Sequence, residues 1–254
     1  MQELIIRECT TIEDFDNCVY LQREAFGLPD LEISPRRHLI VSRHAGGWTL
    51  GAFAGRRLVG FVHHLAAVKD NEVFGYSHMM AVARDYQNHG VGAKLKWAQR
   101  AKALEEGRSF IKWTWDPMQS RNAHFNINRL GVIVATYSDN FYGTDYNADP
   151  TQTEGELPGL QSDRLFASWH LHSQRVAELS EGKSNLISAA PGAKIAIPVD
   201  WASFIKRDIQ QARATQARVR QEFKDAFDAG LICAGFQRGD EWSEYLLYRP
   251  ADVA

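Results

Sequence analysis

Two glycines, Gly90 and Gly92, lie one residue apart at the start of an amphipathic run of residues. Apolar residues recur there every three or four positions, which predicts a helix that Gly107 ends and whose lysines, Lys96 among them, face away from the core. The first amides of a helix lack intrahelical acceptors, and the helix dipole adds about half a positive charge. Glycine has no Cβ, so a phosphate can approach the backbone closely. We therefore predict that main-chain N–H groups of residues 87–93 bind a phosphate or pyrophosphate.

Two common phosphate-binding motifs do not fit this turn. A P-loop has the pattern GxxxxGK[ST], whereas Lys94 follows Gly92 at a different spacing and no Ser or Thr comes after it. A dinucleotide-binding fingerprint has a third glycine where this chain has Leu95, and it lies in a βαβ unit. The strand before this turn instead closes an antiparallel meander, so both motifs are excluded.

The turn resembles the acyl-CoA-binding motif of the GNAT N-acetyltransferase superfamily, since Gln87, Gly90 and Gly92 form a Q-x-x-G-x-G pattern. A second stretch, NAHFNINRLGV over residues 122–132, resembles the family's signature of an Asn and an Ala before a helix that ends in Leu-Gly. The order of expected elements agrees with the family over residues 3–173. The resemblance implies an α+β fold with a mixed, mainly antiparallel sheet and flanking helices.

The elements that must position this turn follow from hydrophobic periodicity and helix-capping residues. A first strand is followed by a helix with a capping box of Thr10 and Glu13, and three antiparallel strands then precede the glycine turn. The longest expected helix runs from a cap at Asp200 to a stop at Gly230. The polar stretch 144–163, rich in Gly and Pro, is expected to be a loop that shapes the acceptor pocket.

Residues 183–193 are small and form the expected domain boundary. We predict a GNAT-like acyl-CoA-binding domain over residues 1–182 and a C-terminal α/β extension over residues 183–254. The extension either completes the same sheet or is a partial duplicate of the core. Its long helix packs on the sheet or forms a subunit interface, which would make the protein a homodimer.

The resemblance also implies which residues contact acetyl-CoA or another acyl-CoA. The pyrophosphate would lie on the amides of the glycine turn: Gln87, Asn88, His89, Gly90, Val91, Gly92 and Ala93. The preceding strand would splay from its neighbour, and an amide of Met80, Ala81 or Val82 would polarise the thioester carbonyl. Asn122 would contact the pantetheine arm.

Candidates for proton transfer are one histidine and two tyrosines. His78 lies on the strand beside the expected thioester, where it could act as a general base or be a half-buried histidine with a backbone partner. Many relatives place a Tyr where this chain has Ile127. The leaving thiolate would then be protonated by Tyr137 or Tyr142, or leave unaided, because a thiol has a pKa of about 8.5.

Two further residues are candidates for substrate binding. Arg164, after the polar loop, could clamp a carboxylate bidentately or pair with Asp163. A carboxylate on the acyl group would favour succinyl-CoA beside acetyl-CoA. Trp115 lies either in the core or on the wall of a substrate cavity.

Composition excludes several classes of protein. The net charge of −2 does not suit a nucleic-acid-binding protein, and no stretch is apolar enough for a signal peptide or membrane span. Three separated cysteines suit a reducing cytoplasm. No metal is expected, because Cys and His lack metal-site spacing and the adjacent His63 and His64 point to opposite faces of a strand.

These observations lead to one predicted function and one alternative. The chain is expected to be a cytoplasmic N-acyltransferase that moves an acyl group from acyl-CoA to an amine of a small molecule. Direct attack in a ternary complex is expected, since no Cys or Ser is placed for a covalent step. The alternative is a CoA-binding sensor or scaffold without turnover, which the Ile127 position motivates.

Overall fold

The computed structural model describes residues 3–146, 158–184 and 187–253. The chain forms two compact units, whose boundary falls between Lys112 and Trp113, inside strand β5 (Phe110–Trp115). Unit 1 comprises the described residues up to Lys112, and unit 2 those from Trp113 onwards. The acyl-CoA-binding domain over residues 1–182 therefore stays a prediction, and the boundary between the units lies inside it.

Unit 1 is built on a sheet in the order β1-β2-β3-β4-β5. The first four strands are β1 (Leu4–Glu8), β2 (Trp48–Ala54), β3 (Arg57–Lys69) and β4 (Glu72–Val82). Neighbours among these four strands are antiparallel, whereas β4 pairs in parallel with the start of β5. Asp70 and Asn71 join β3 to β4 with positive φ angles of 53° and 62°, as a two-residue hairpin turn of the primed type requires. The predicted antiparallel meander is confirmed.

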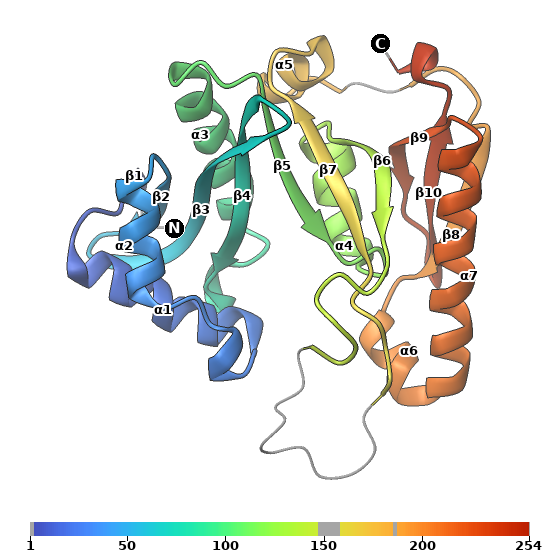
Figure 1. The fold of residues 1–254 in the computed structure, drawn as a ribbon, viewed down its shortest axis with the longest axis horizontal. Coiled ribbons are helices and arrows are strands. Elements are labelled where there is room, and N and C mark those ends of the chain that lie inside the picture. Colours follow the sequence, from blue (N-terminus) through green and yellow to red (C-terminus); the bar gives the residue numbers. More distant parts are fainter. Residues whose placement is uncertain (1–2, 147–157, 185–186, 254) are drawn as a thin grey trace. The chain divides into compact units, whose positions relative to one another are not determined.

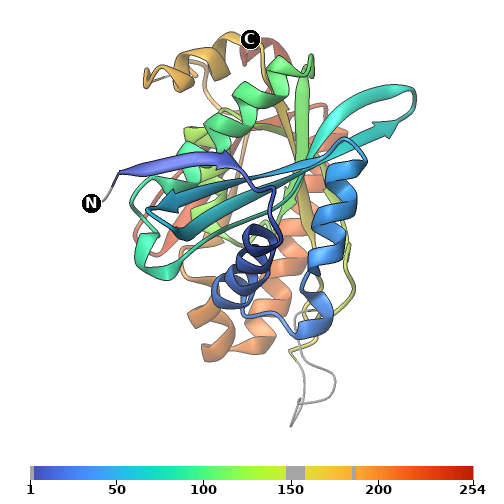
Figure 2. The same ribbon diagram turned by 90° about the vertical axis from the view of Figure 1, so that its left-hand side faces the viewer.

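Helices cover both faces of this sheet. Helices α1 (Ile12–Phe26) and α2 (Arg36–His44) contact each other, and both contact β3. Helix α1 also contacts β4, and α2 also contacts β2; Figure 2 shows both helices in blue next to these strands. Helix α3 (Val91–Glu105) contacts β2, β3 and β4. The two adjacent histidines of β3 show that these are opposite faces, because His63 bonds to Ser42 of α2 and His64 bonds to Gln99 of α3.

Two local predictions for unit 1 were wrong. The capping box of α1 consists of Thr11 and Asp14, one residue later than predicted, because the Asp14 carboxylate accepts from both Thr10 N and Thr11 N. Lys96 of α3 is buried, although it was expected to face away from the core. Its Nζ donates to Ser77 Oγ at 2.8 Å and to Gln99 Oε1 at 3.0 Å, which compensates part of the cost of burial.

Unit 2 contains a sheet in the order β5-β7-β6-β9-β10-β8. The strands are β6 (Ile133–Ser138), β7 (Arg164–His170), β8 (Ala193–Pro198), β9 (Ile232–Gln237) and β10 (Trp242–Tyr248). Val134 of β6 pairs with Cys233 of β9, so the C-terminal strands extend the sheet that β6 and β7 begin. Helix α4 (Ser120–Ala123) leads into a π-helix over His124–Arg129, and α5 (Gln174–Ser180) follows β7.

The long C-terminal helix is interrupted. Instead of one helix from Asp200 to Gly230, the chain forms α6 (Trp201–Arg207) and α7 (Ile209–Asp228). Asp208 breaks the helix with extended backbone, and its side chain caps α7 by accepting from Gln211 N at 2.9 Å. Figure 1 shows α7 running along the strands of unit 2 that it packs against. Among the described residues, no helix is both long and apolar enough to cross a membrane.

Candidate active site

The glycine turn of unit 1 begins α3 as predicted. A short 3₁₀ helix over Arg84–Tyr86 precedes it, and Asn88 and Gly90 have positive φ angles of 66° and 78°. Gly90 is the N-cap, and the first helical bond runs from Lys94 N to Gly90 O at 3.0 Å. A Cβ at Gly90 would meet no atom within 4 Å, so glycine is favoured here by its backbone conformation and not by crowding within the protein. Exposed amides at the start of a helix are suited to bind an anion.

A side chain connects this turn to the strand before it. Gln87 Nε2 donates to the carbonyl oxygen of Val82, the last residue of β4, at 3.1 Å. The amides of the turn and the end of β4 are therefore held together within one unit.

The direction of the β4 amides follows from its pairing with β3. Ala83 N donates to Val59 O at 2.9 Å, and Ala81 lies opposite Phe61 two residues earlier. In an antiparallel ladder, alternate residues direct their N–H and C=O groups to opposite sides. The backbone groups of Met80 and Val82 therefore point away from β3, whereas those of Ala81 point toward it. Of the three residues predicted to polarise the thioester, a ligand on the side of β4 away from β3 could therefore reach the N–H groups of Met80 and Val82.

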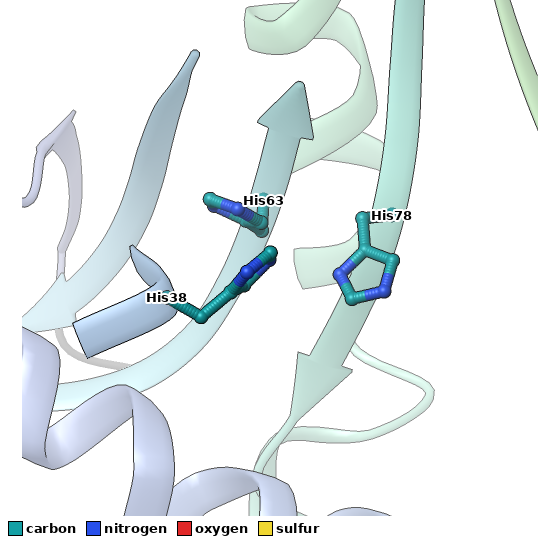
Figure 3. Close-up of side chains that lie close together, drawn as sticks. All are labelled: His38, His63 and His78. Carbon is teal, nitrogen blue, oxygen red and sulfur yellow. The ribbon is translucent and has the colours of Figure 1, made fainter. Parts of the chain in front are cut away.

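A bulge in β4 positions His78. His63 pairs with Met79 and His64 pairs with Ser77, so β4 has one residue more than β3 at this point, and that residue is His78. A bulge leaves the extra residue unpaired and redirects its side chain. His78 thereby lies on the α2 side of the sheet, near His38 and His63 (Figure 3).

The environment makes His63 and His78 weak bases. Burial, followed by repulsion from His78 and His38, lowers the pKa of His63 to about 3. His78 keeps an exposed surface, yet burial of its ring, together with His38, lowers its pKa to about 4. Both imidazoles are therefore neutral at pH 7.

Tyr137, a predicted acid, belongs to a half-buried network in unit 2. Its hydroxyl donates to Asp163 Oδ2 at 2.7 Å, and Arg220 donates to both oxygens of the same carboxylate at 2.9 and 3.0 Å. Burial, then the charge of Asp163, raises the pKa of Tyr137 above its usual value. The Asp163 carboxylate is thus paired with Arg220 and not with its neighbour Arg164.

Arg164 is buried beside two aromatic rings of unit 2. Its guanidinium carbon lies 5.0 Å from the ring centre of Tyr142 and 5.2 Å from that of Tyr146. Its Nη1 donates to the backbone oxygen of Asp163 at 3.1 Å. Tyr142, the other predicted acid, is 49% exposed and so remains accessible from solvent.

The remaining predicted residues of unit 2 differ in exposure. Asn122 is exposed on α4, whereas Trp115 is buried and donates from Nε1 to Tyr245 Oη at 3.3 Å, as a core residue does. Ile127, which occupies the family's usual Tyr position, is fully buried in the π-helix. Most of the predicted acceptor loop 144–163 lies outside the described residues.

Sequence reasoning did not find His38 or the bulge at His78. His38 precedes Ser42 by one helical turn, which places both on one face of α2, but this spacing alone indicates no site. Adjacent residues of β3 were correctly expected on opposite faces, and the structure adds which neighbours each histidine contacts.

Comparison with known proteins agrees with this geometry. Residues 11–131 match the model of the Acetyltransferase (GNAT) family. No curated protein matches the chain. The ribosomal-protein-S18-alanine N-acetyltransferase from Escherichia coli is 15% identical with a TM-score of 0.53, covering 67% of this chain and 96% of its own. A GNAT-family protein from Desulfovibrio desulfuricans is 13% identical with a TM-score of 0.54, covering 66% and 99%. The protein smu.2055 from Streptococcus mutans is 15% identical with a TM-score of 0.51, again covering 66% and 99%.

At these identities the solved structures show a shared fold, and the family match adds the class of domain. The predicted α+β fold, with a mainly antiparallel sheet and flanking helices, is confirmed. The chain carries, over residues 11–131, an acetyltransferase domain of the GNAT family.

Proposed function

We propose that this protein transfers an acyl group from acyl-CoA to an amine of a small molecule, by direct attack in a ternary complex. The observation that carries the proposal is the turn 87–93, whose helix-initiating amides are connected to the end of β4 through Gln87 and Val82. In this proposal the pyrophosphate of CoA lies on the turn, and the thioester lies along the edge of β4.

The backbone of β4 would supply electrostatic stabilisation. The N–H groups of Met80 and Val82 face the edge away from β3, and Val82 O is already occupied by Gln87. One of these two amides would donate to the oxyanion of the tetrahedral intermediate. A single oxyanion donor is worth about 3–4 kcal/mol of transition-state stabilisation in other enzymes.

Proton transfer would involve a weak base and a weak acid. His78, neutral at pH 7, would accept a proton from the attacking amine through water, although its pKa of about 4 limits the driving force. Of the two tyrosines, Tyr142 is the better candidate acid, because the hydroxyl proton of Tyr137 is already held by Asp163. Unassisted departure of the thiolate remains the alternative, since a thiol has a pKa of about 8.5.

Arg164 is the candidate residue for substrate selection. Among the described residues, the buried Arg164 guanidinium donates to one acceptor, the backbone oxygen of Asp163, so its remaining N–H groups would suit a carboxylate. We therefore propose that succinyl-CoA be compared with acetyl-CoA as donor. Contacts of Asn122 with the pantetheine arm and of Trp115 with a substrate remain predictions, as does a cytoplasmic location.

The experiment is an assay of CoA thiol release with both donors and a panel of small-molecule amines, together with calorimetry of CoA binding. Turnover on any amine, with CoA affinity that depends on Gly90, supports the proposal. Absence of CoA binding would overturn it.

A second function is favoured by the burial of Ile127 at the position where relatives carry Tyr. The protein would then be a CoA-binding sensor or scaffold. CoA binding without turnover on every amine and with both donors would favour this function. Turnover would exclude it.

A further inference from the structure

Three histidines from different elements bring their rings together in unit 1. His38 extends from α2, His63 from β3 and His78 from the bulge in β4 (Figure 3). The ring centre of His38 lies 5.5 Å from that of His63 and 5.4 Å from that of His78. The ring centres of His63 and His78 lie 6.0 Å apart. One ring nitrogen from each residue lies within 4.8 Å of the others. We name this group the histidine cluster.

The most buried member, His63, has its ring fixed by hydroxyl groups. Its Nδ1 lies 2.7 Å from Thr49 Oγ1, and its Nε2 lies 3.0 Å from Ser42 Oγ. Ser42 Oγ also donates to Leu39 O at 3.0 Å, so this hydroxyl has an alternative partner. If Nδ1–H donates to Thr49, the lone pair of Nε2 faces Ser42 on the α2 side, and it becomes available to a ligand when the Ser42 hydroxyl donates to Leu39 O instead. Proteins orient metal-binding imidazoles in a comparable way, through a hydrogen bond from the other ring nitrogen.

His38 has a buried nitrogen without a partner. Among the described residues, its Nε2 is buried and makes no hydrogen bond. Buried polar atoms are almost always satisfied in folded proteins, and an unsatisfied one requires an explanation. A buried, unsatisfied nitrogen on an imidazole that lies beside two further imidazoles is explained if the three residues share a ligand.

We propose that His38, His63 and His78 bind a divalent transition-metal ion, with zinc as the expected ion. Three imidazole nitrogens suit zinc and its neighbours in the first transition row, and not magnesium or calcium, which prefer oxygen. Nitrogens around a tetrahedral zinc ion lie about 3.3 Å apart, so metal binding requires the three rings to move closer together from a spacing within 4.8 Å. The exposed side of His78 leaves a fourth position for water.

Binding of a metal ion at this site would change the role of His78, the proposed base. A metal ion on His78 takes the lone pair that would otherwise accept a proton from the amine. Metal binding and the base role of His78 therefore exclude each other, and zinc would inhibit acyl transfer. The metal site itself does not depend on acyl transfer, because its binding is measured without CoA or an amine.

The test uses the full chain without a histidine tag, freed of metal by a chelator. Zinc is measured by equilibrium dialysis with elemental analysis, and Co²⁺ is titrated while its visible d–d absorption is recorded. One ion per chain and the intense absorption of a low-coordinate nitrogen site are expected. Binding of no ion, or a Co²⁺ spectrum identical to that of the hydrated ion, overturns the proposal regardless of any variant.

Variants locate the site. His38→Ala and His78→Ala should each lower zinc affinity by about tenfold or more, and Thr49→Val, which alters the partner of His63, by about 10- to 100-fold. His44→Ala is the matched control, since His44 is exposed at the end of the same helix and outside the cluster. Circular dichroism verifies that each variant is folded. Equal affinity in the wild type and in folded His38→Ala would place the metal elsewhere and refute the assignment.

Discussion

Gln87 Nε2 donates to Val82 O at 3.1 Å, and this bond connects the turn that begins α3 to the strand that it follows. Removing it by Gln87→Ala should weaken CoA binding by about 2- to 10-fold, since a hydrogen bond of this kind is worth about 0.5–1.5 kcal/mol. Calorimetry with CoA measures the change. Gln174→Ala, on α5 of unit 2 and outside the proposed site, should leave the affinity unchanged, and an unchanged affinity in Gln87→Ala would contradict the prediction.

Gly90 and Gly107 flank helix α3 and share one backbone conformation. Their φ angles are 78° and 73°, and a Cβ at either would meet no atom within 4 Å. Alanine at each position should therefore cost about 1–2 kcal/mol of stability. Only Gly90→Ala should also lower CoA affinity, by at least about tenfold, because only there would the Cβ meet the phosphate. Thermal unfolding and calorimetry separate the two effects, and equal losses of affinity would refute the phosphate site.

Arg220 neutralises the Asp163 carboxylate, whose side chain is 0% exposed. Arg220→Met should lower the free energy of unfolding by about 2–4 kcal/mol, because it leaves a buried charge without its partner. Lys224→Met on the same helix breaks an exposed pair with Asp139 and should cost less than about 1 kcal/mol. Urea unfolding compares the variants, and similar losses in both would show that burial of Asp163 is unimportant.

Asp14 should make stability depend on pH in the acid range. Hydrogen bonds from Arg7, Thr10 and Thr11 hold the pKa of Asp14 well below its usual value, against the opposite effect of burial. Its contribution is complete above the unfolded pKa of about 3.9 and is lost as pH falls through the lowered folded pKa. The stability difference between wild type and Asp14→Asn should therefore shrink as pH decreases.

Urea unfolding over a series of pH values measures that difference. Asp16→Asn is the control, because Asp16 pairs with Arg36 at an exposed surface and should show a small difference at every pH. A pH-independent difference for Asp14→Asn would contradict the prediction.

Hydrophobic patterns and turn residues in the sequence predicted the elements whose formation depends on residues close together along the chain. Apolar stretches separated by short turn-forming breaks identified β2, β3 and β4, and glycines at the ends of α3 marked both its cap and its stop. The break at Asp208 was missed, since hydrophobic periodicity continues across it while the carboxylate competes with the helix as a cap.

Such patterns could not predict contacts between elements that are distant in sequence. Gln216 interrupts the apolar seam of α7, and the structure shows why: its amide bonds both the N–H and the C=O of Gln161. Lys96 can be buried because Ser77 Oγ, on a different element, accepts a hydrogen bond from its Nζ. The histidine cluster likewise forms only when α2, β3 and β4 pack together, so no spacing along the chain could reveal it.

The bulge in β4 has a consequence for how this protein could have changed over time. Ser77 lies opposite His64 and Met79 lies opposite His63, which leaves His78 as a supernumerary residue in the ladder. Loss of that single codon would leave both halves of the ladder in register, with the same partners on either side. A lineage could therefore acquire or discard this imidazole in one insertion or deletion without rebuilding the sheet around it.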